Sequence, residues 1–200
     1  MPTAHLVHGF NVSDGGASTL DKLRSSFEDR GFSVLEHDSR WSRGIFRDLL
    51  SVRFGNGNRA ERLASAIRPD DVIVGHSNGC AVITMACWLL AQMEPTFKVR
   101  CMFLNPALDR DASQSPIVSG VLVFHTKSDW IVRAASWLPF HKWGSMGRLG
   151  HNGIQKAVYW NVAYETLGLR KLGHSGVFKH KESLQLVMQG FDDWTEELEL

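Results

Sequence analysis

Short apolar runs alternate along the chain with longer segments in which apolar residues recur at helical spacing. The runs have the length of buried strands. Six of them are found, at about residues 4–7, 32–36, 71–74, 99–104, 121–124 and 158–162. Strands that alternate with helices are typical of a parallel sheet, so the pattern predicts an α/β fold. No linker, repeat or low-complexity tract divides the chain, and a single domain over residues 1–200 is expected.

Apolar residues at helical spacing predict the helices between these strands. The first helix carries Leu20, Leu23 and Phe27 on one face, and the last extends over about 184–198. The clearest helix begins after Ser77. Its predicted buried face consists of Ala81, Val82, Met85, Ala86, Leu89, Leu90 and Met93.

The segment 38–58 gives mixed signals. Some buried helix is suggested by its apolar residues, Trp41, Phe46, Leu49 and Leu50. Residues 55–58, Gly-Asn-Gly-Asn, have the composition of a turn. A separate helix is therefore expected from about Arg59 to Ile67.

Composition and charge exclude several classes of protein. Hydrophobic residues make up 44% of the chain and charged residues 22%, which argues against a disordered or fibrous protein. The formal net charge of +1 gives no indication of a nucleic-acid partner. No apolar stretch approaches the ~20 residues of a membrane span, and the N-terminus lacks a signal-peptide pattern. Cys80, Cys87 and Cys101 lack the spacing of a zinc or redox site, so free thiols in the reducing cytoplasm are expected.

Polar residues and glycine stand at the ends of four predicted strands, at His8, Gly75, Asn105 and His125. In a parallel sheet these positions share the carboxyl edge, where open α/β sheets bind their ligands. His5 and His8 lack the third partner that a metal site needs. No cofactor motif is found either, so neither a metal nor a cofactor is expected.

The strongest chemical signal is Gly75-His76-Ser77-Asn78-Gly79, which fits the pattern G-x-S-x-G. It lies between a predicted strand and a predicted helix, where a sharp turn raises a serine hydroxyl above the sheet. The flanking glycines let the backbones approach closely, and the helix points free N–H groups toward the serine. Ser77 is therefore the candidate nucleophile; the alternative is a chance serine at a helix start.

This segment resembles the nucleophile elbow of the α/β-hydrolase family, and the resemblance extends over most of the chain. His5-Leu6-Val7-His8-Gly9-Phe10 is similar to the His-Gly segment that supplies half of the oxyanion hole in that family. The resemblance implies a three-layer α/β/α sandwich of about six strands, trimmed at the edge relative to many members. It also implies that the backbone N–H groups of Phe10 and Asn78 bind the oxyanion.

A serine nucleophile needs a base, and the base needs an orienting acid. The family's order of serine, acid and histidine implies His174 as the base, in a short glycine-flanked loop. It implies Asp129, shortly after a predicted strand, as the acid. The other candidates for these two roles are His125, His151 and His180 for the base, and Asp109 and Asp111 for the acid.

An aromatic segment follows Asp129. Residues 130–155 include Trp130, Trp137 and Trp143, and clustered tryptophans rarely stay exposed without a partner. The functional interpretation is a small lid or a substrate-binding wall that contains these three side chains. Packing on the core or a homodimer contact would cover them equally well.

Together these features predict a cytoplasmic serine hydrolase that cleaves a small-molecule acyl ester through an acyl-enzyme intermediate. An amide or thioester is the less favoured substrate, because the same fold hosts many reactions. One alternative is a non-catalytic binding or scaffold protein that retains the fold. Another is a binder of lipid or carbohydrate surfaces that uses the tryptophan-rich segment.

Overall fold

The computed structural model describes residues 1–9, 14, 16–37, 45–135, 144–153 and 158–198, with the backbone alone for 45–55 and 135. In these residues a six-stranded sheet has the order β2-β1-β3-β4-β5-β6, and all paired strands are parallel. The strands are β1 (Thr3–Val7), β2 (Ser33–His37), β3 (Val72–His76), β4 (Val99–Leu104), β5 (Val118–His125) and β6 (Tyr159–Ala163). The predicted parallel sheet is confirmed, and every strand overlaps its predicted range.

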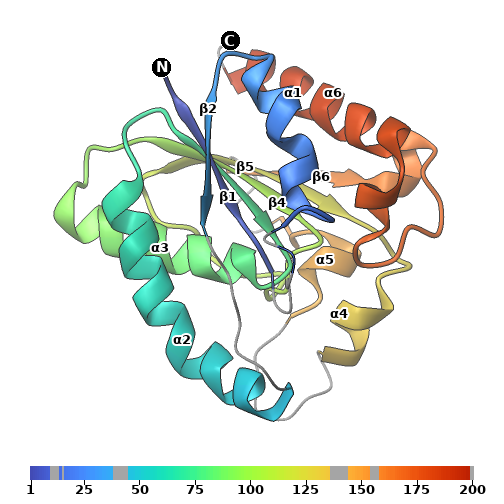
Figure 1. The fold of residues 1–200 in the computed structure, drawn as a ribbon, viewed down its shortest axis with the longest axis horizontal. Helices are drawn as coiled ribbons and strands as arrows, with labels where there is room; N and C mark the ends of the chain where they lie inside the picture. The colour runs from blue at the N-terminus through green and yellow to red at the C-terminus, as the bar shows by residue number, and fades with distance from the viewer. Residues whose placement is uncertain (10–13, 15, 38–44, 136–143, 154–157, 199–200) are drawn as a thin grey trace.

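Helices cover both faces of the sheet and complete three layers (Figure 1). Helices α2 and α3 lie on one face, and α1 and α6 lie on the other. The α-helices are α1 (Arg24–Glu28), α2 (Ile45–Ala66), α3 (Gly79–Met93), α4 (Trp130–Ala135), α5 (Met146–Leu149) and α6 (Lys181–Leu198). Short 3-10 helices are η1 (Leu20–Leu23), η2 (Tyr164–Leu167) and η3 (Gly176–Lys179).

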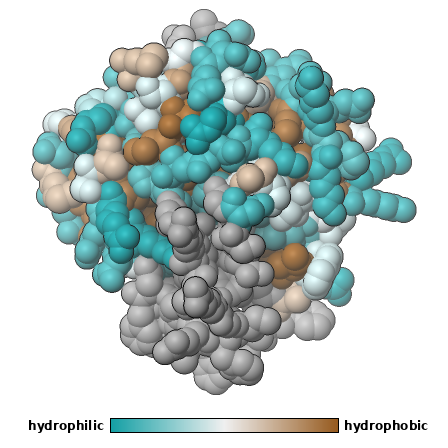
Figure 2. Space-filling model, in the orientation of Figure 1, coloured by the Kyte–Doolittle hydropathy of each residue, from teal (hydrophilic) through white to brown (hydrophobic). Residues whose placement is uncertain are grey.

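Successive residues of each strand face opposite cores, because side chains alternate across a sheet. In β3, Ile73 belongs to the core beneath α2 and α3, whereas Val72 and Val74 belong to the core beneath α1 and α6. The second core also contains Phe191 and Trp194 of α6. The outer surface is largely hydrophilic on the face shown in Figure 2, with scattered hydrophobic residues.

Helix α2 shows that the turn predicted at residues 55–58 is wrong. The helix runs from Ile45 to Ala66 without a break. A glycine costs a helix about 1 kcal/mol relative to alanine. However, α2 packs along α3 and buries Ala60 and Leu63 in the core, which offsets the weak local propensity. Trp41, on which part of the earlier expectation rested, lies outside the described residues.

The buried face of α3 also differs from the predicted one. Met85 and Met93 are exposed, although Val82, Ala86 and Leu90 are buried as predicted. The buried residues of this helix are Gly79, Cys80, Val82, Ile83, Ala86, Cys87 and Leu90. Apolar residues surround α3 on every side, so their spacing could not select a single face.

Cys80, Cys87 and Cys101 are free and buried, which confirms the expectation of unpaired thiols. Within the described part of the chain, no helix combines the length and the apolar character that crossing a bilayer requires. The single domain and the lid-like segment at 130–155 stay predictions, since 136–143 and 154–157 lie outside the described residues.

Candidate active site

Ser77 occupies a sharp turn between a strand and a helix. Strand β3 ends at His76 and α3 begins at Gly79. The φ angle of Ser77 is 55°, in the left-handed region that residues other than glycine rarely adopt. This conformation is held by its neighbours, because Ser77 N donates to Leu104 O at 3.1 Å and Ser77 O accepts from Ala107 N at 3.1 Å. Strain of this kind is concentrated at functional sites, and here it presents a half-buried serine at the carboxyl edge of the sheet.

Glycines surround this turn because side chains would not fit. A Cβ atom at Gly79 would collide with the carbonyl oxygen of Val7, so α3 starts in direct contact with the end of β1. A Cβ atom at Gly75 would lie 2.6 Å from Cδ1 of Ile83. A Cβ atom at Gly9 would lie 2.8 Å from Cβ of Ser77. Both glycines of the G-x-S-x-G motif and the glycine after His8 therefore bring the segments of the site together.

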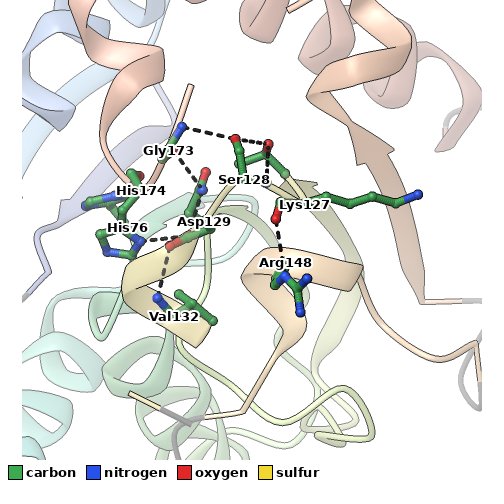
Figure 3. Close-up of polar contacts among 10 residues, drawn as sticks. His76, Lys127, Ser128, Asp129, Val132, Arg148, Gly173 and His174 are labelled. Atoms are coloured by element: carbon green, nitrogen blue, oxygen red, sulfur yellow. Dashed lines mark hydrogen bonds and ion pairs between the residues drawn. The ribbon is translucent and has the colours of Figure 1, made fainter. Parts of the chain in front are cut away.

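His174 and Asp129 form a short hydrogen bond beside this turn (Figure 3). Nδ1 of His174 lies 2.7 Å from Oδ2 of Asp129. Asp129 follows the carboxyl end of β5 and precedes α4, while His174 lies in the loop between η2 and η3. The two residues are 45 positions apart in the sequence, and the parallel sheet brings their loops to one edge.

The Asp129 carboxyl is fully buried and well supplied with donors. Oδ1 accepts from the backbone N–H of Val132 at 3.0 Å, and Oδ2 also accepts from Nδ2 of Asn105 at 2.9 Å. Burial alone would raise the pKa of Asp129, but the hydrogen bond from His174, aided by Val132 and Asn105, outweighs it and lowers the pKa. The carboxylate is thus kept ionised beside the imidazole of His174.

Ser77 Oγ makes no hydrogen bond to His174 among the described residues. The two residues are nevertheless neighbours, because His76, next to Ser77 in the chain, donates from Nε2 to the carbonyl oxygen of His174 at 3.1 Å. Bonds between a nucleophile and its base are often long before substrate binds. The His174–Asp129 bond is thus formed, while in the described part of the chain Ser77 lies beside it without a hydrogen bond to His174.

Asn78 stands at the N-cap of α3, where helix N–H groups lack partners within the helix. Among the described residues, no acceptor is bonded to its backbone N–H. Its side chain is buried and donates from Nδ2 to Oδ1 of Asn56 on α2 at 3.2 Å. The free backbone donor suits an anion beside Ser77. Phe10, the second predicted donor, lies outside the described residues.

Searches with this chain found no matching protein-family model and no matching curated protein sequence. Solved structures do match. A pyrethroid hydrolase from Sphingobium faniae has a TM-score of 0.58 at 12% identity, covering 98% of this chain and 97% of that one. Mouse alpha/beta hydrolase domain-containing protein 10 has a TM-score of 0.55 at 13% identity, covering 99% and 91%. An alpha/beta hydrolase enzyme from a sediment metagenome of the Mar Chica lagoon, Morocco, has a TM-score of 0.52 at 13% identity, covering 100% and 93%.

This chain has the α/β-hydrolase fold. The expectation drawn from the Gly75–Gly79 and His5–Phe10 segments is thereby confirmed at the level of the fold. The α/β-hydrolase fold hosts many reactions, so function must be argued from the site itself.

The other predicted site residues are placed as follows. Asp109 is exposed, and no histidine bonds to it among the described residues. His151 stacks on Tyr159 with ring centroids 3.6 Å apart. Trp130 begins α4 directly after Asp129 and is 68% exposed. Trp137 and Trp143 lie outside the described residues.

The roles of two residues of the site were missed by sequence reasoning. Asn105, at the end of β4, is fully buried with a φ of 47° and donates to Asp129. His76, inside the serine motif, holds the backbone of His174. The available signal was the polar character of both positions at the end of an apolar strand, where a buried polar group needs a specific partner. Within the described residues, no cluster of three or more potential ligands is placed to hold a metal.

Proposed function

We propose that this chain is a serine hydrolase that cleaves a carboxylic ester through an acyl-enzyme intermediate. The observation that carries the proposal is the hydrogen bond of 2.7 Å between His174 and the buried Asp129, placed beside a serine at a strained strand-to-helix turn. An activated serine requires a base, and the base requires an acid that fixes its tautomer.

In the first half of the reaction, Ser77 Oγ attacks the ester carbonyl carbon while its proton passes to Nε2 of His174. Asp129 accepts from Nδ1–H and stabilises the imidazolium that forms. The carbonyl oxygen becomes an oxyanion, and the backbone N–H of Asn78 is positioned to bind it. Such donors are effective because they are already oriented before charge develops, and losing one typically costs ~3 kcal/mol of transition-state stabilisation.

In the second half, the imidazolium of His174 protonates the alkoxide as the C–O bond breaks, and the alcohol leaves. A water molecule then enters, His174 removes its proton, and the hydroxide attacks the acyl carbon. Collapse of the second tetrahedral intermediate releases the acid and returns the proton to Ser77. Every proton removed by His174 is thus given back within one cycle.

The three free buried cysteines support a reducing, cytoplasmic location for this enzyme. We infer a small-molecule acyl ester as the substrate class. Trp130, exposed beside Asp129, supports the expected apolar wall at one side of the site.

The test is hydrolysis of p-nitrophenyl acetate by the purified chain, followed by stopped-flow absorbance. We expect a burst of p-nitrophenol equal to the enzyme concentration, because acylation precedes a slower release by water. Ser77→Ala removes one oxygen atom and should lower kcat by roughly 10⁴-fold or more. A mutant that keeps the wild-type rate would refute the proposal. Binding of a long-chain ester without turnover would favour a non-catalytic binding protein.

A further inference from the structure

His76 is a buried polar residue in an otherwise apolar row. Alternation along β3 places Val72, Val74 and His76 on the face covered by α1 and α6. The side chain is 4% exposed and packs edge-on against Phe178 of η3, with ring centroids 5.0 Å apart. Burying an imidazole among apolar side chains is unfavourable unless its polar atoms are hydrogen-bonded. The position therefore calls for an explanation beyond core packing.

The hydrogen bond of His76 goes to the backbone of the proposed base. Its Nε2 lies 3.1 Å from the carbonyl oxygen of His174. A carbonyl oxygen can only accept, so Nε2 carries the hydrogen. Burial, followed by the nearby charge of His174, lowers the pKa of His76 to about 3. His76 is therefore neutral at physiological pH, with one donor and one lone pair in fixed positions.

The loop that carries His174 is held at four points (Figure 3). Nδ2 of Asn105 donates to the carbonyl oxygen of Gly173 at 3.5 Å. The backbone N–H of Gly173 donates to Oγ of Ser128 at 3.2 Å, and the imidazole of His174 donates to Asp129. The carbonyl oxygen of His174 accepts from His76. Ser128 and Asp129 both follow β5, so they tie the loop to the acid. His76 alone of these partners is the chain neighbour of Ser77, and it ties the loop to the nucleophile.

We propose that His76 is a positioning residue that sets the distance between the base and the nucleophile by holding the carbonyl of His174. The inference rests on the proposed serine hydrolase reaction. The hydrogen bond acts through the backbone of His174 and leaves Nε2 of its ring available for the proton of Ser77. The two imidazole rings also pack together, with centroids 4.8 Å apart. A misplacement of about 1 Å in such a pair can cost ~100-fold in rate.

Three variants separate positioning from stability. His76→Gln keeps an N–H donor at the ε position, whereas His76→Leu has a similar volume and no donor. Val187→Ala weakens the same core on α6, away from the site, and serves as the matched control for lost stability. His76→Asn, whose amide is too short to place its donor at the ε position, replaces His76→Leu if that variant does not fold. Folding is checked by circular dichroism and urea unfolding.

Two measurements are made on each variant. Ester hydrolysis gives kcat and KM, and proton NMR gives the far-downfield resonance of the Nδ1–H of His174 in its bond to Asp129. We expect His76→Leu to lower kcat by roughly 10- to 100-fold with KM nearly unchanged, and to broaden the resonance through faster exchange. His76→Gln should restore both to within a few-fold of wild type, and Val187→Ala should change neither.

The outcomes distinguish this inference from the proposed reaction. A folded His76→Leu with wild-type kcat and resonance would overturn the positioning role. Equal losses in His76→Gln, His76→Leu and Val187→Ala would also overturn it, because they would indicate a role in stability alone. If the wild type shows no turnover, but the resonance is sharp in wild type and His76→Gln and broadened in His76→Leu, the positioning role stands and the proposed reaction fails.

Discussion

The chain contains two buried histidine–aspartate pairs of nearly the same geometry. The nitrogen–oxygen distance is 2.7 Å in His174–Asp129 and 2.8 Å in His5–Asp71. The pairs differ at the second ring nitrogen of each histidine. In His5 that nitrogen, Nδ1, lies 2.8 Å from Nε2 of His37, so both ring nitrogens are occupied. Nε2 of His174 has no hydrogen-bond partner among the described residues.

The difference shows that a short bond to a carboxylate does not by itself make a histidine a base. A catalytic base must keep one ring nitrogen for the proton that it removes, and His5 has none to spare. The two pairs also differ in where they lie along the strands. Asp71 precedes β3 and Ser77 follows it, so Asp71 lies near the amino ends of the strands, about 20 Å from the elbow by strand rise. The comparison supports the catalytic role proposed for His174–Asp129 and favours a structural role for His5–Asp71.

The largest expected effect is that of Asp129→Asn on the rate. The amide would present a donor to Nδ1 of His174 or favour the wrong tautomer, and kcat should fall by about 10⁴-fold. The measurement is steady-state hydrolysis of p-nitrophenyl acetate. Asp109→Asn is the matched control, since replacing this exposed carboxylate should leave kcat unchanged. If Asp109→Asn lowers the rate and Asp129→Asn does not, the acid has been assigned wrongly.

Asp71→Asn should affect stability and leave the rate nearly unchanged. The Asp71 carboxylate accepts from Thr3 N at 2.8 Å, from Arg68 N at 2.7 Å and from His5. An amide has a single acceptor oxygen, so at least one buried donor would lose its partner. We expect the free energy of unfolding in urea to fall by about 2–4 kcal/mol. A folded variant with a 100-fold lower kcat would show that the two pairs are coupled.

As the pH falls, the stability that His37 contributes beside the His5–Asp71 pair should be lost at a higher pH than the stability that Asp129 contributes. Burial, aided by the charges of His5 and His8, lowers the pKa of His37 to about 4 from its ordinary 6.5. The unfolded chain therefore binds more protons between pH 6.5 and 4, and stability falls as pH falls through this window. The lowered pKa of Asp129 instead contributes stability that is lost only below its ordinary value of 3.8.

The variant His37→Gln tests whether His37 causes the loss of stability between pH 6.5 and 4. Because one pKa unit is worth about 1.4 kcal/mol, His37 should account for roughly 2–3 kcal/mol of the stability lost by pH 4. Urea unfolding of wild type and His37→Gln at pH 7 and pH 4 measures the difference. His37 also lines a cavity of about 150 Å³. Equal losses in the two proteins would place the acid sensitivity elsewhere.

The smallest expected effect is that of a residue beside the His174–Asp129 pair, Trp130. Trp130 is 68% exposed next to Asp129, and Trp88 is 42% exposed on the outer side of α3. If Trp130 forms part of the substrate wall, Trp130→Ala should raise KM a few-fold for p-nitrophenyl butyrate and less for the acetate. Trp88→Ala should change neither KM. The measurement is KM for both esters with both variants. An unchanged KM for Trp130→Ala would show that Trp130 does not contact the substrate.

The fold could be predicted because each strand is a compact apolar run bounded by polar or turn residues. Such runs are visible locally, and their alternation with helices indicates a parallel sheet. The sequence predicted a turn at residues 55–58 because Gly and Asn favour turns locally. In the fold, packing against α3 stabilises a continuous helix α2 over these residues. The buried face of α3 was missed for a related reason, since only contact with the sheet distinguishes its apolar sides.

The candidate site was predictable in part. Ser77 is marked by its own motif, and His174 and Asp129 could be selected because the chain resembles a family of fixed residue order. The structure brings the acid and base into contact, and their catalytic roles stay predictions. Asn105 and His76 stood out only as polar residues at the ends of apolar strands. Their roles could not be predicted, because their partners lie elsewhere in the chain: 98 positions separate His76 from His174. Side-chain bonds across such distances leave no periodic pattern in a sequence.

Labelling with a fluorophosphonate tests the central claim most directly, because this reagent reacts with serines that a base has activated. The purified chain is treated at neutral pH and analysed by intact mass and peptide mapping. We predict one phosphonyl adduct, located on Ser77, absent from Ser77→Ala and formed far more slowly in His174→Ala. A folded protein that gains no adduct, or one that is modified on a different residue, would contradict the assignment of Ser77 as the nucleophile.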